Sequence, residues 1–143
     1  MELPARTETG VYDLGNTVTL EWLLDGRMVY VSLNNSQRTA IETWFKAVEA
    51  IGQMWEPEQK YMAAYNLTGV GLTPYFRQRS LDMARVVRHL QGCYAIIISD
   101  SDPVSSVTRT YFEHNISRAS ARVGQVFETD ADALAWLESQ LDT

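Results

Sequence analysis

The longest uninterrupted apolar run of the chain spans residues 93–98 and reads Cys-Tyr-Ala-Ile-Ile-Ile. Its three consecutive isoleucines leave no alternation between apolar and polar positions. A run of this kind and length is typical of a parallel β-strand that is covered on both faces. Because helices usually provide that cover, the run predicts an α/β fold in which strands and helices alternate.

A different pattern, with a period of two, lies nearer the N-terminus. Residues 17–24 (TVTLEWLL) alternate polar and apolar side chains, which indicates a strand with one solvated face. Asp25-Gly26 follows as a strong signal for a two-residue hairpin turn, and residues 27–33 provide the returning strand. Residues 11–14 add a short strand before this pair. The pattern therefore predicts an antiparallel hairpin.

Helical periodicity and strand-like runs alternate through the remaining residues. Each helix is expected to begin at a side chain that caps free backbone N–H groups. The candidate caps are Ser36 or Thr39, Thr73, Asp102, and Thr129 or Asp130. Further strands are expected at residues 61–67, 94–99 and 123–127. In the helix after Asp102, the side chains of Val104, Val107 and Tyr111 are expected to face inward.

These elements predict a single domain at residues 11–143 after a polar, frayed N-terminus at residues 1–10. The expected fold class is α/β. It has a mixed β-sheet with an N-terminal antiparallel hairpin, then alternating β-α units with right-handed crossovers and about four helices. In such sheets, ligands commonly bind at the loops that follow the carboxyl ends of the strands.

Composition and charge limit the compartment and the kind of partner. No apolar run approaches the roughly 20 residues of a membrane-spanning helix, and the single cysteine excludes an internal disulfide. Together with an N-terminus unlike a secretory signal, this predicts a cytoplasmic protein. The net charge is −6, but residues 61–127 carry +3. The acidic total argues against nucleic acid as partner, whereas the basic middle suits an acidic protein surface.

No group of residues has the spacing of a catalytic, cofactor-binding or metal-binding site. His89 and His114 lack companions at ligand spacing. Asp100 and Asp102 offer two carboxylates that suit Mg²⁺ or a phosphoryl group, although a cap and a turn explain both equally well. The glycine-containing loop at residues 68–71 lacks the other residues of a phosphate-binding motif. We therefore expect a protein that is not an enzyme and has no cofactor.

A stripe of arginines is expected on the helix that follows Thr73. At about 100° per residue, Arg77, Arg85 and Arg88 lie within about 80° of one another, whereas Arg79 lies elsewhere around the helix. Such a stripe is either a solvated face or an interaction surface.

Two segments resemble the STAS family, the fold of bacterial anti-anti-sigma factors of the SpoIIAA type. Residues 64–70, Ala-Tyr-Asn-Leu-Thr-Gly-Val, are similar to the central strand and the following turn of that family. Residues 126–137 are similar to the last strand and helix of many members, and the order of elements agrees over about residues 11–141. The resemblance implies a regulatory domain that binds a protein partner.

The phosphorylated serine of the family has no counterpart in this chain. Aligned from Asn66 without gaps, the family's Asp-Ser pair falls on Pro74 and Tyr75. The resemblance thus implies a protein-binding module without the usual phosphorylation switch. It also implies that the turn and helix at residues 68–88 face the partner. The candidate partner-binding residues are Thr68, Gly69, Thr73, Tyr75, Arg77, Arg85 and Arg88.

The expected partner is a protein, and a second copy of the chain that forms a homodimer is one candidate. Some SpoIIAA-like domains are related in fold to Sec14-type lipid-binding domains. The alternative function is therefore that of a carrier for an apolar small molecule or lipid, with aromatic side chains lining its pocket.

Overall fold

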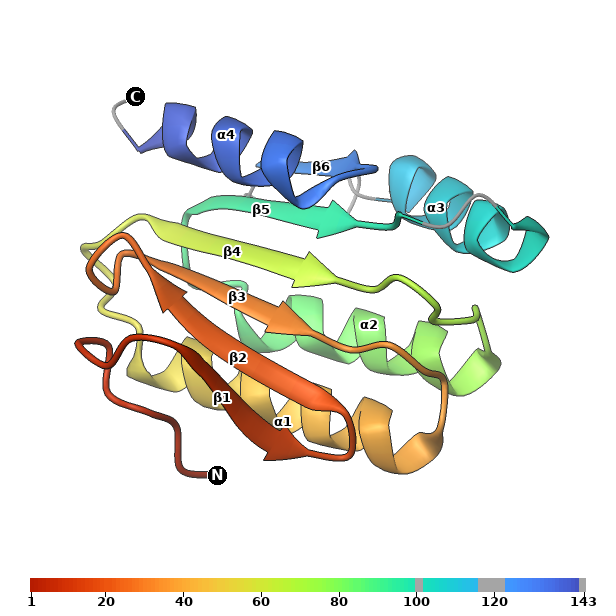
Figure 1. Cartoon of the computed structure of the whole chain (residues 1–143), viewed down its shortest axis with the longest axis horizontal. Coiled ribbons are helices and arrows are strands. Elements are labelled where there is room, and N and C mark those ends of the chain that lie inside the picture. Colours follow the sequence, from red (N-terminus) through yellow and green to blue (C-terminus); the bar gives the residue numbers. More distant parts are fainter. Residues whose placement is uncertain (100–101, 116–122, 142–143) are drawn as a thin grey trace.

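A six-stranded mixed sheet with the order β1-β2-β3-β4-β5-β6 forms the centre of the molecule (Figure 1). The computed structural model describes residues 1–99, 102–115 and 123–141. The strands are β1 (Val11–Gly15), β2 (Val18–Leu23), β3 (Met28–Ser32), β4 (Tyr61–Asn66), β5 (Gly92–Ile97) and β6 (Val123–Phe127). The helices are α1 (Arg38–Met54), α2 (Pro74–Val86), α3 (Pro103–Asn115) and α4 (Asp130–Gln140).

The sheet combines an antiparallel N-terminal part with a parallel remainder. β1, β2 and β3 pair antiparallel, whereas β3, β4, β5 and β6 pair parallel. Each parallel strand is joined to the next by one helix, which is the crossover that parallel pairing requires. The α/β class, the antiparallel hairpin, the alternating β-α units and the four helices predicted from the sequence are thus confirmed.

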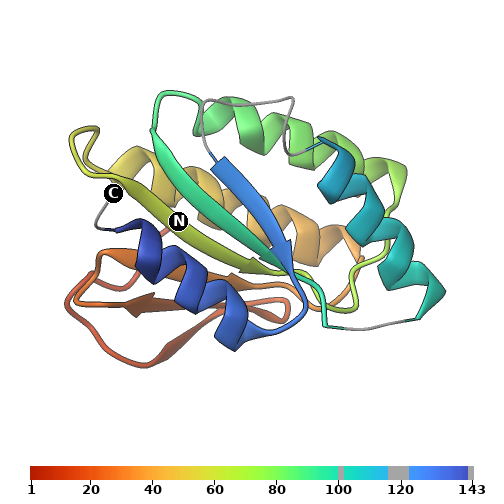
Figure 2. The same ribbon diagram turned by 90° about the horizontal axis from the view of Figure 1, so that it is seen from above.

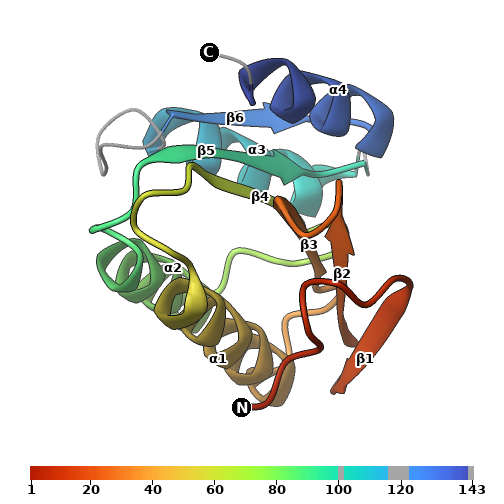
Figure 3. The same ribbon diagram turned by 90° about the vertical axis from the view of Figure 1, so that its left-hand side faces the viewer.

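Helices cover both faces of the sheet. α1 and α2 lie side by side on one face, and α4 lies on the opposite face (Figure 3). Seen from above, α3 lies past the carboxyl ends of β5 and β6 (Figure 2). Within the described residues, no helix combines the length and apolar character needed to cross a membrane.

Alternate residues of the central strands enter two separate apolar clusters. Tyr65 and Ile96 pack towards α1 and α2, whereas Met62 and Ile97 pack towards α4. Ile96 and Ile97 are 1% and 0% exposed, so β5 is buried on both faces as its apolar run predicts. Each inward residue of the parallel strands therefore has a helix opposite it.

Three of the predicted helix caps are present. Thr73 Oγ1 accepts a hydrogen bond from Phe76 N at 3.1 Å, and Asp102 Oδ1 accepts one from Ser105 N at 2.8 Å. Thr129 Oγ1 caps α4 in the same way. By contrast, α1 begins after Gln37 with no side-chain cap, so neither Ser36 nor Thr39 has the predicted role.

The hairpin connection differs from the predicted two-residue turn. Leu23 pairs with Met28, so four residues connect β2 and β3. Leu24 and Asp25 have φ angles of 52° and 56°, and Gly26 has a φ of 81°. The left-handed region thus begins one residue before the Asp-Gly pair.

The N-terminal segment also differs from the frayed terminus that its polar composition predicts. Pro4 is buried, and its carbonyl oxygen accepts a 3.0 Å hydrogen bond from Trp22 Nε1. Arg6 is half-buried over the rings of Trp22 and Trp55. The segment is therefore fixed to the apolar core by contacts that hydropathy does not register.

Candidate functional site

The loop that follows β4 contacts its neighbouring loops at Thr68 and Gly69. Thr68 Oγ1 accepts a 2.9 Å hydrogen bond from Ser99 N, and Thr68 N donates to Asn66 Oδ1. Gly69 has a φ of 85°, and a Cβ at this position would lie 2.9 Å from the carbonyl oxygen of Asn34. Both residues thus have local structural roles at the carboxyl edge of the sheet.

The remaining predicted residues lie on two different sides of α2. Tyr75 is turned towards α1, where the guanidinium of Arg38 lies 4.3 Å from the centre of its ring. Arg77 is turned towards α3, where its guanidinium lies 5.7 Å from the ring of Tyr111. Tyr75 and the arginine stripe, which were expected to form one surface, therefore lie on two different surfaces of α2.

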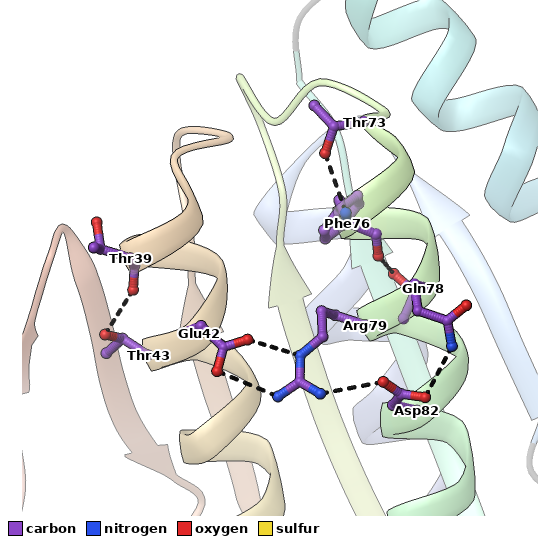
Figure 4. A network of polar contacts seen from close by, with 9 residues as sticks. Thr39, Glu42, Thr43, Thr73, Phe76, Gln78, Arg79 and Asp82 are labelled. Carbon is purple, nitrogen blue, oxygen red and sulfur yellow. Dashed lines mark hydrogen bonds and ion pairs between the residues drawn. The ribbon is translucent and has the colours of Figure 1, made fainter.

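Arg79 links α1 and α2 (Figure 4), and it lies on the same surface as Tyr75. Its Nε lies 2.9 Å from Glu42 Oε1, and its Nη1 lies 3.1 Å from Asp82 Oδ2. The guanidinium also lies 3.5 Å from the centre of the Phe45 ring. As predicted, Arg79 lies outside the stripe, and its ion pairs tie the two helices together.

An open groove of about 640 Å³ lies beside this ion-pair network. Its lining residues are Asn16, Arg38, Thr39, Glu42, Thr43, Lys46, Tyr75 and Arg79. Three of these residues are cationic and one is a carboxylate. The groove therefore carries more positive than negative side chains.

Arg77 and Arg85 are exposed on α2, whereas Arg88 lies beyond Val86, the last residue of α2, and not on the helix as predicted. Arg77, Arg85 and Arg88 all face solvent. Arg85 Nη1 lies 3.8 Å from Asp82 Oδ1, and neither Arg77 nor Arg88 forms an ion pair with a described residue. Leu81, which the sequence analysis did not select, is 46% exposed among them. Its position four residues after Arg77 places it on the same side of the helix.

The helix α3 is rotated relative to its predicted orientation. Val104 and Val107 are each 57% exposed, whereas Ser105 and Thr108 are buried. Thr108 Oγ1 donates a 3.0 Å hydrogen bond to the carbonyl oxygen of Val70, which satisfies the buried hydroxyl. The prediction that Val104 and Val107 face inward is therefore wrong, because this tertiary hydrogen bond places the small polar side chains inside.

A polar cluster joins β3, β4 and α4 at the carboxyl edge of the sheet. Tyr30, Asn66 and Asp130 form it through side-chain hydrogen bonds. Burial raises the pKa of Tyr30 to about 12, and the nearby Asp130 carboxylate adds to this rise. The phenol therefore stays protonated and acts as a hydrogen-bond donor at neutral pH. Sequence analysis missed this cluster, because its members are far apart in the chain.

The residues considered for chemistry are not brought into a common site. Asp102 caps α3, and Asp100 lies outside the described residues. His89 and His114 are exposed. Burial raises the pKa of the Cys93 thiol, which disfavours a reactive thiolate. Over residues 1–99, 102–115 and 123–141, no three His, Cys, Asp or Glu side chains lie close enough to hold a metal ion.

Comparisons with known proteins identify no relative of this chain. No family model, no curated protein and no solved structure matches the chain. The STAS family therefore remains a resemblance of short sequence segments and of element order.

Proposed function

We propose that the chain is a non-enzymatic regulatory protein-binding module that binds its partner on one surface of α2 and α3. This α2–α3 surface consists of Arg77, Leu81, Arg85, Arg88, Val104 and Val107. The observation that supports it best is the outward orientation of Val104 and Val107, on the same helix as Tyr111, whose ring lies beside Arg77. Apolar side chains beside free arginines are a common composition of protein interfaces.

The position of Arg77 connects the two parts of the α2–α3 surface. Its guanidinium lies 5.7 Å from the ring of Tyr111, which is on α3 one helical turn beyond Val107. The basic side of α2 and the apolar side of α3 are therefore neighbours. A partner segment that pairs acidic with apolar side chains complements such a surface in both charge and polarity.

The resemblance to STAS domains supports the same region. Residues 68–88 correspond to the turn and helix that commonly face partners in that family, and α2 lies within them. Regulation by phosphorylation is not part of the proposal, because the aligned positions are Pro74 and Tyr75. The Oγ1 atom of nearby Thr73 already caps α2.

The α2–α3 surface is tested by quantitative affinity capture with matched variants. The test variant is Val104→Ser/Val107→Ser, and the control is Val123→Ser, which changes another valine that is 59% exposed. We expect a partner that the wild type and the control retain and the double variant loses. Equal retention by all three proteins would place the interface elsewhere.

Binding kinetics then test the contribution of charge. Exposed charges chiefly set the rate of encounter, and salt screens them. The Arg77→Glu/Arg88→Glu variant should therefore slow association with the captured partner, and added salt should reduce the difference. Surface plasmon resonance at two salt concentrations measures both effects. Unchanged association at low salt contradicts a role for the arginines.

Tyr75 tests how far the interface extends around α2. The sequence-based prediction is that Tyr75→Ala weakens binding more than any single arginine-to-alanine change, because aromatic anchors contribute most affinity. Tyr75 lies on the α1 side, under Arg38. A loss larger than that of Arg77→Ala would extend the interface into the α1–α2 groove, whereas no loss would confine it to the α2–α3 surface.

The alternative of a carrier for an apolar molecule lacks a comparable observation. Of the four tryptophans that could line a pocket, Trp22, Trp44 and Trp55 are buried in contact with other aromatic rings of the core. The half-buried Trp136 packs on Phe127. The groove between α1 and α2 is lined largely by charged and polar residues.

A further inference from the structure

A cage of aromatic rings closes around a cation at the N-terminal segment. The guanidinium of Arg6 lies 4.2 Å from the ring centre of Trp55 and 5.3 Å from that of Trp22. The two indoles are 6.1 Å apart, and Tyr61 packs on Trp55 at 4.9 Å. The faces of indole rings attract cations more strongly than other aromatic side chains do. The cage is thus built for a positive charge.

Hydrogen bonding to this cation is incomplete. Arg6 Nη1 donates a 2.8 Å hydrogen bond to Gln59 Oε1. Arg6 Nε and Nη2 are shielded from solvent and have no hydrogen-bond partner among the described residues. Buried donors without acceptors destabilise the folded state. The cage therefore provides aromatic faces for a charge but few acceptors for its N–H groups.

This mismatch indicates which cations the cage favours. A quaternary ammonium group carries a positive charge but no N–H donor, so burying it against the faces of the two indoles leaves no donor unsatisfied. We propose that the Trp22–Trp55 cage is a binding site for methylated ammonium groups, and that Arg6 occupies it as a competing ligand from the same chain.

The N-terminal segment packs on the core through Leu3 and the buried Pro4, but it forms no strand pairing before Val11. Beside the cation, its polar link to the cage is the hydrogen bond from Trp22 Nε1 to the carbonyl oxygen of Pro4. The segment also passes close to Gly26, where a Cβ would lie 2.7 Å from that of Arg6. Residues 7–10 are exposed. Lifting the segment thus uncovers the cage without breaking a strand pairing, since β1 begins at Val11.

The proposal is independent of the α2–α3 surface. The cage is formed by β2, by Trp55 after the end of α1 and by the N-terminal segment, none of which contributes to that surface. Either proposal therefore stands if the other fails.

The test uses choline and its uncharged carbon analogue, 3,3-dimethylbutan-1-ol, with the full chain and the Arg6→Ala variant. Tryptophan fluorescence measures binding, because both indoles would contact the ligand. We expect saturable binding of choline to Arg6→Ala and at least tenfold weaker binding to the wild type, in which Arg6 competes. The uncharged analogue should bind neither protein measurably, since it lacks the charge.

Two further variants locate the binding. Arg27→Ala removes an exposed arginine for which the described residues show no cation–π contact with either indole, and it should respond as the wild type does. Arg6→Ala/Trp55→Phe keeps an aromatic ring in the core and should bind choline several-fold more weakly than Arg6→Ala. Equal affinities for these two Arg6 variants, or for wild type and Arg6→Ala, would overturn the proposal.

Protein stability provides a second measurement if Arg6→Ala folds poorly. A ligand that binds the folded state raises the melting temperature. Choline should therefore raise the melting temperature of Arg6→Ala more than sodium chloride at equal ionic strength does. The wild type at high choline should show the same preference over the uncharged analogue. No preference for the charged compound in either protein contradicts a cation site.

Discussion

The hydroxyl of Tyr30 donates a 2.8 Å hydrogen bond to Oδ1 of Asp130, joining β3 to the first turn of α4. Asn66 Nδ2 donates to the same hydroxyl oxygen at 2.8 Å and so adds β4 to the connection. The helix that covers the second face of the sheet is thereby aligned with two strands.

Replacing Tyr30 by phenylalanine tests that connection. Tyr30→Phe removes the donor to Asp130, and we expect a loss on the order of 1 kcal/mol in the free energy of unfolding at pH 7. Urea denaturation measures the loss. A variant as stable as the wild type would show that α4 is positioned by apolar packing alone.

The raised pKa of Tyr30 predicts that the stability difference between the wild type and this variant depends on pH. The folded-state pKa of Tyr30 is about 12, above the value of about 10 for an unfolded chain. Because the folded protein binds this proton more tightly, the contribution of Tyr30 is complete below about pH 10 and falls as the pH rises towards 12. The stability difference between wild type and Tyr30→Phe should therefore shrink over that range. A constant difference would contradict the raised pKa.

The central strand provides a prediction for the core. Ile97, the last residue of β5, is fully buried against α4. Ile97→Ala should lower the free energy of unfolding by about 2–5 kcal/mol, because it leaves a cavity in addition to removing buried apolar surface. Chemical denaturation checks this value. An unchanged midpoint would contradict the position of β5 between two helix layers.

The rotation of α3 is tested by a pair of substitutions. Val107→Ser changes an exposed side chain and should alter the free energy of unfolding by less than about 0.5 kcal/mol. Phe112→Ala, on the buried side against Phe76, should cost about 3–5 kcal/mol. If Val107→Ser proves to be the more damaging change, the helix has the orientation expected from hydropathy.

Arg79 provides a prediction for the contact between α1 and α2. Arg79→Met removes the ion pairs to Glu42 and Asp82 but keeps much of the side-chain volume over Phe45. These ion pairs are partly exposed, so we expect a loss of about 1 kcal/mol or less that diminishes with salt. Arg85→Met is the control and should have almost no effect. Equal losses would mean that the Arg79 ion pairs do not stabilise the helix contact.

Periodicity predicted most of the fold because apolar residues dominate the elements that are buried. The run around Ile97 and the apolar side of α1 belong to this class, as do the caps at Thr73 and Asp102. In each case, the sequence pattern that indicates the element lies within a few residues of the chain. Local patterns were therefore sufficient for the order of elements.

The failures have a different physical origin. Thr108 is buried because its hydroxyl finds the carbonyl oxygen of Val70, 38 residues away. Arg6 lies over the indoles of Trp22 and Trp55, and the Tyr30 hydroxyl binds Asp130, which is 100 residues further along the chain. Polar and cation–π contacts between distant segments leave no periodic signal. For the same reason, the sequence placed Tyr75 with the arginine stripe, although Arg38 of α1 draws it to the other side of α2.

The strand order also has a consequence for synthesis of the protein on the ribosome. Each strand pairs with its immediate predecessor, so the sheet can grow strand by strand as the chain emerges, with little waiting for distant segments. The exception is the face that holds Met28, Met62 and Ile97, because α4 follows all six strands. A nascent chain that has completed β6 but not α4 thus exposes this apolar face to solvent. A chaperone that shields apolar surface would be most useful during this interval.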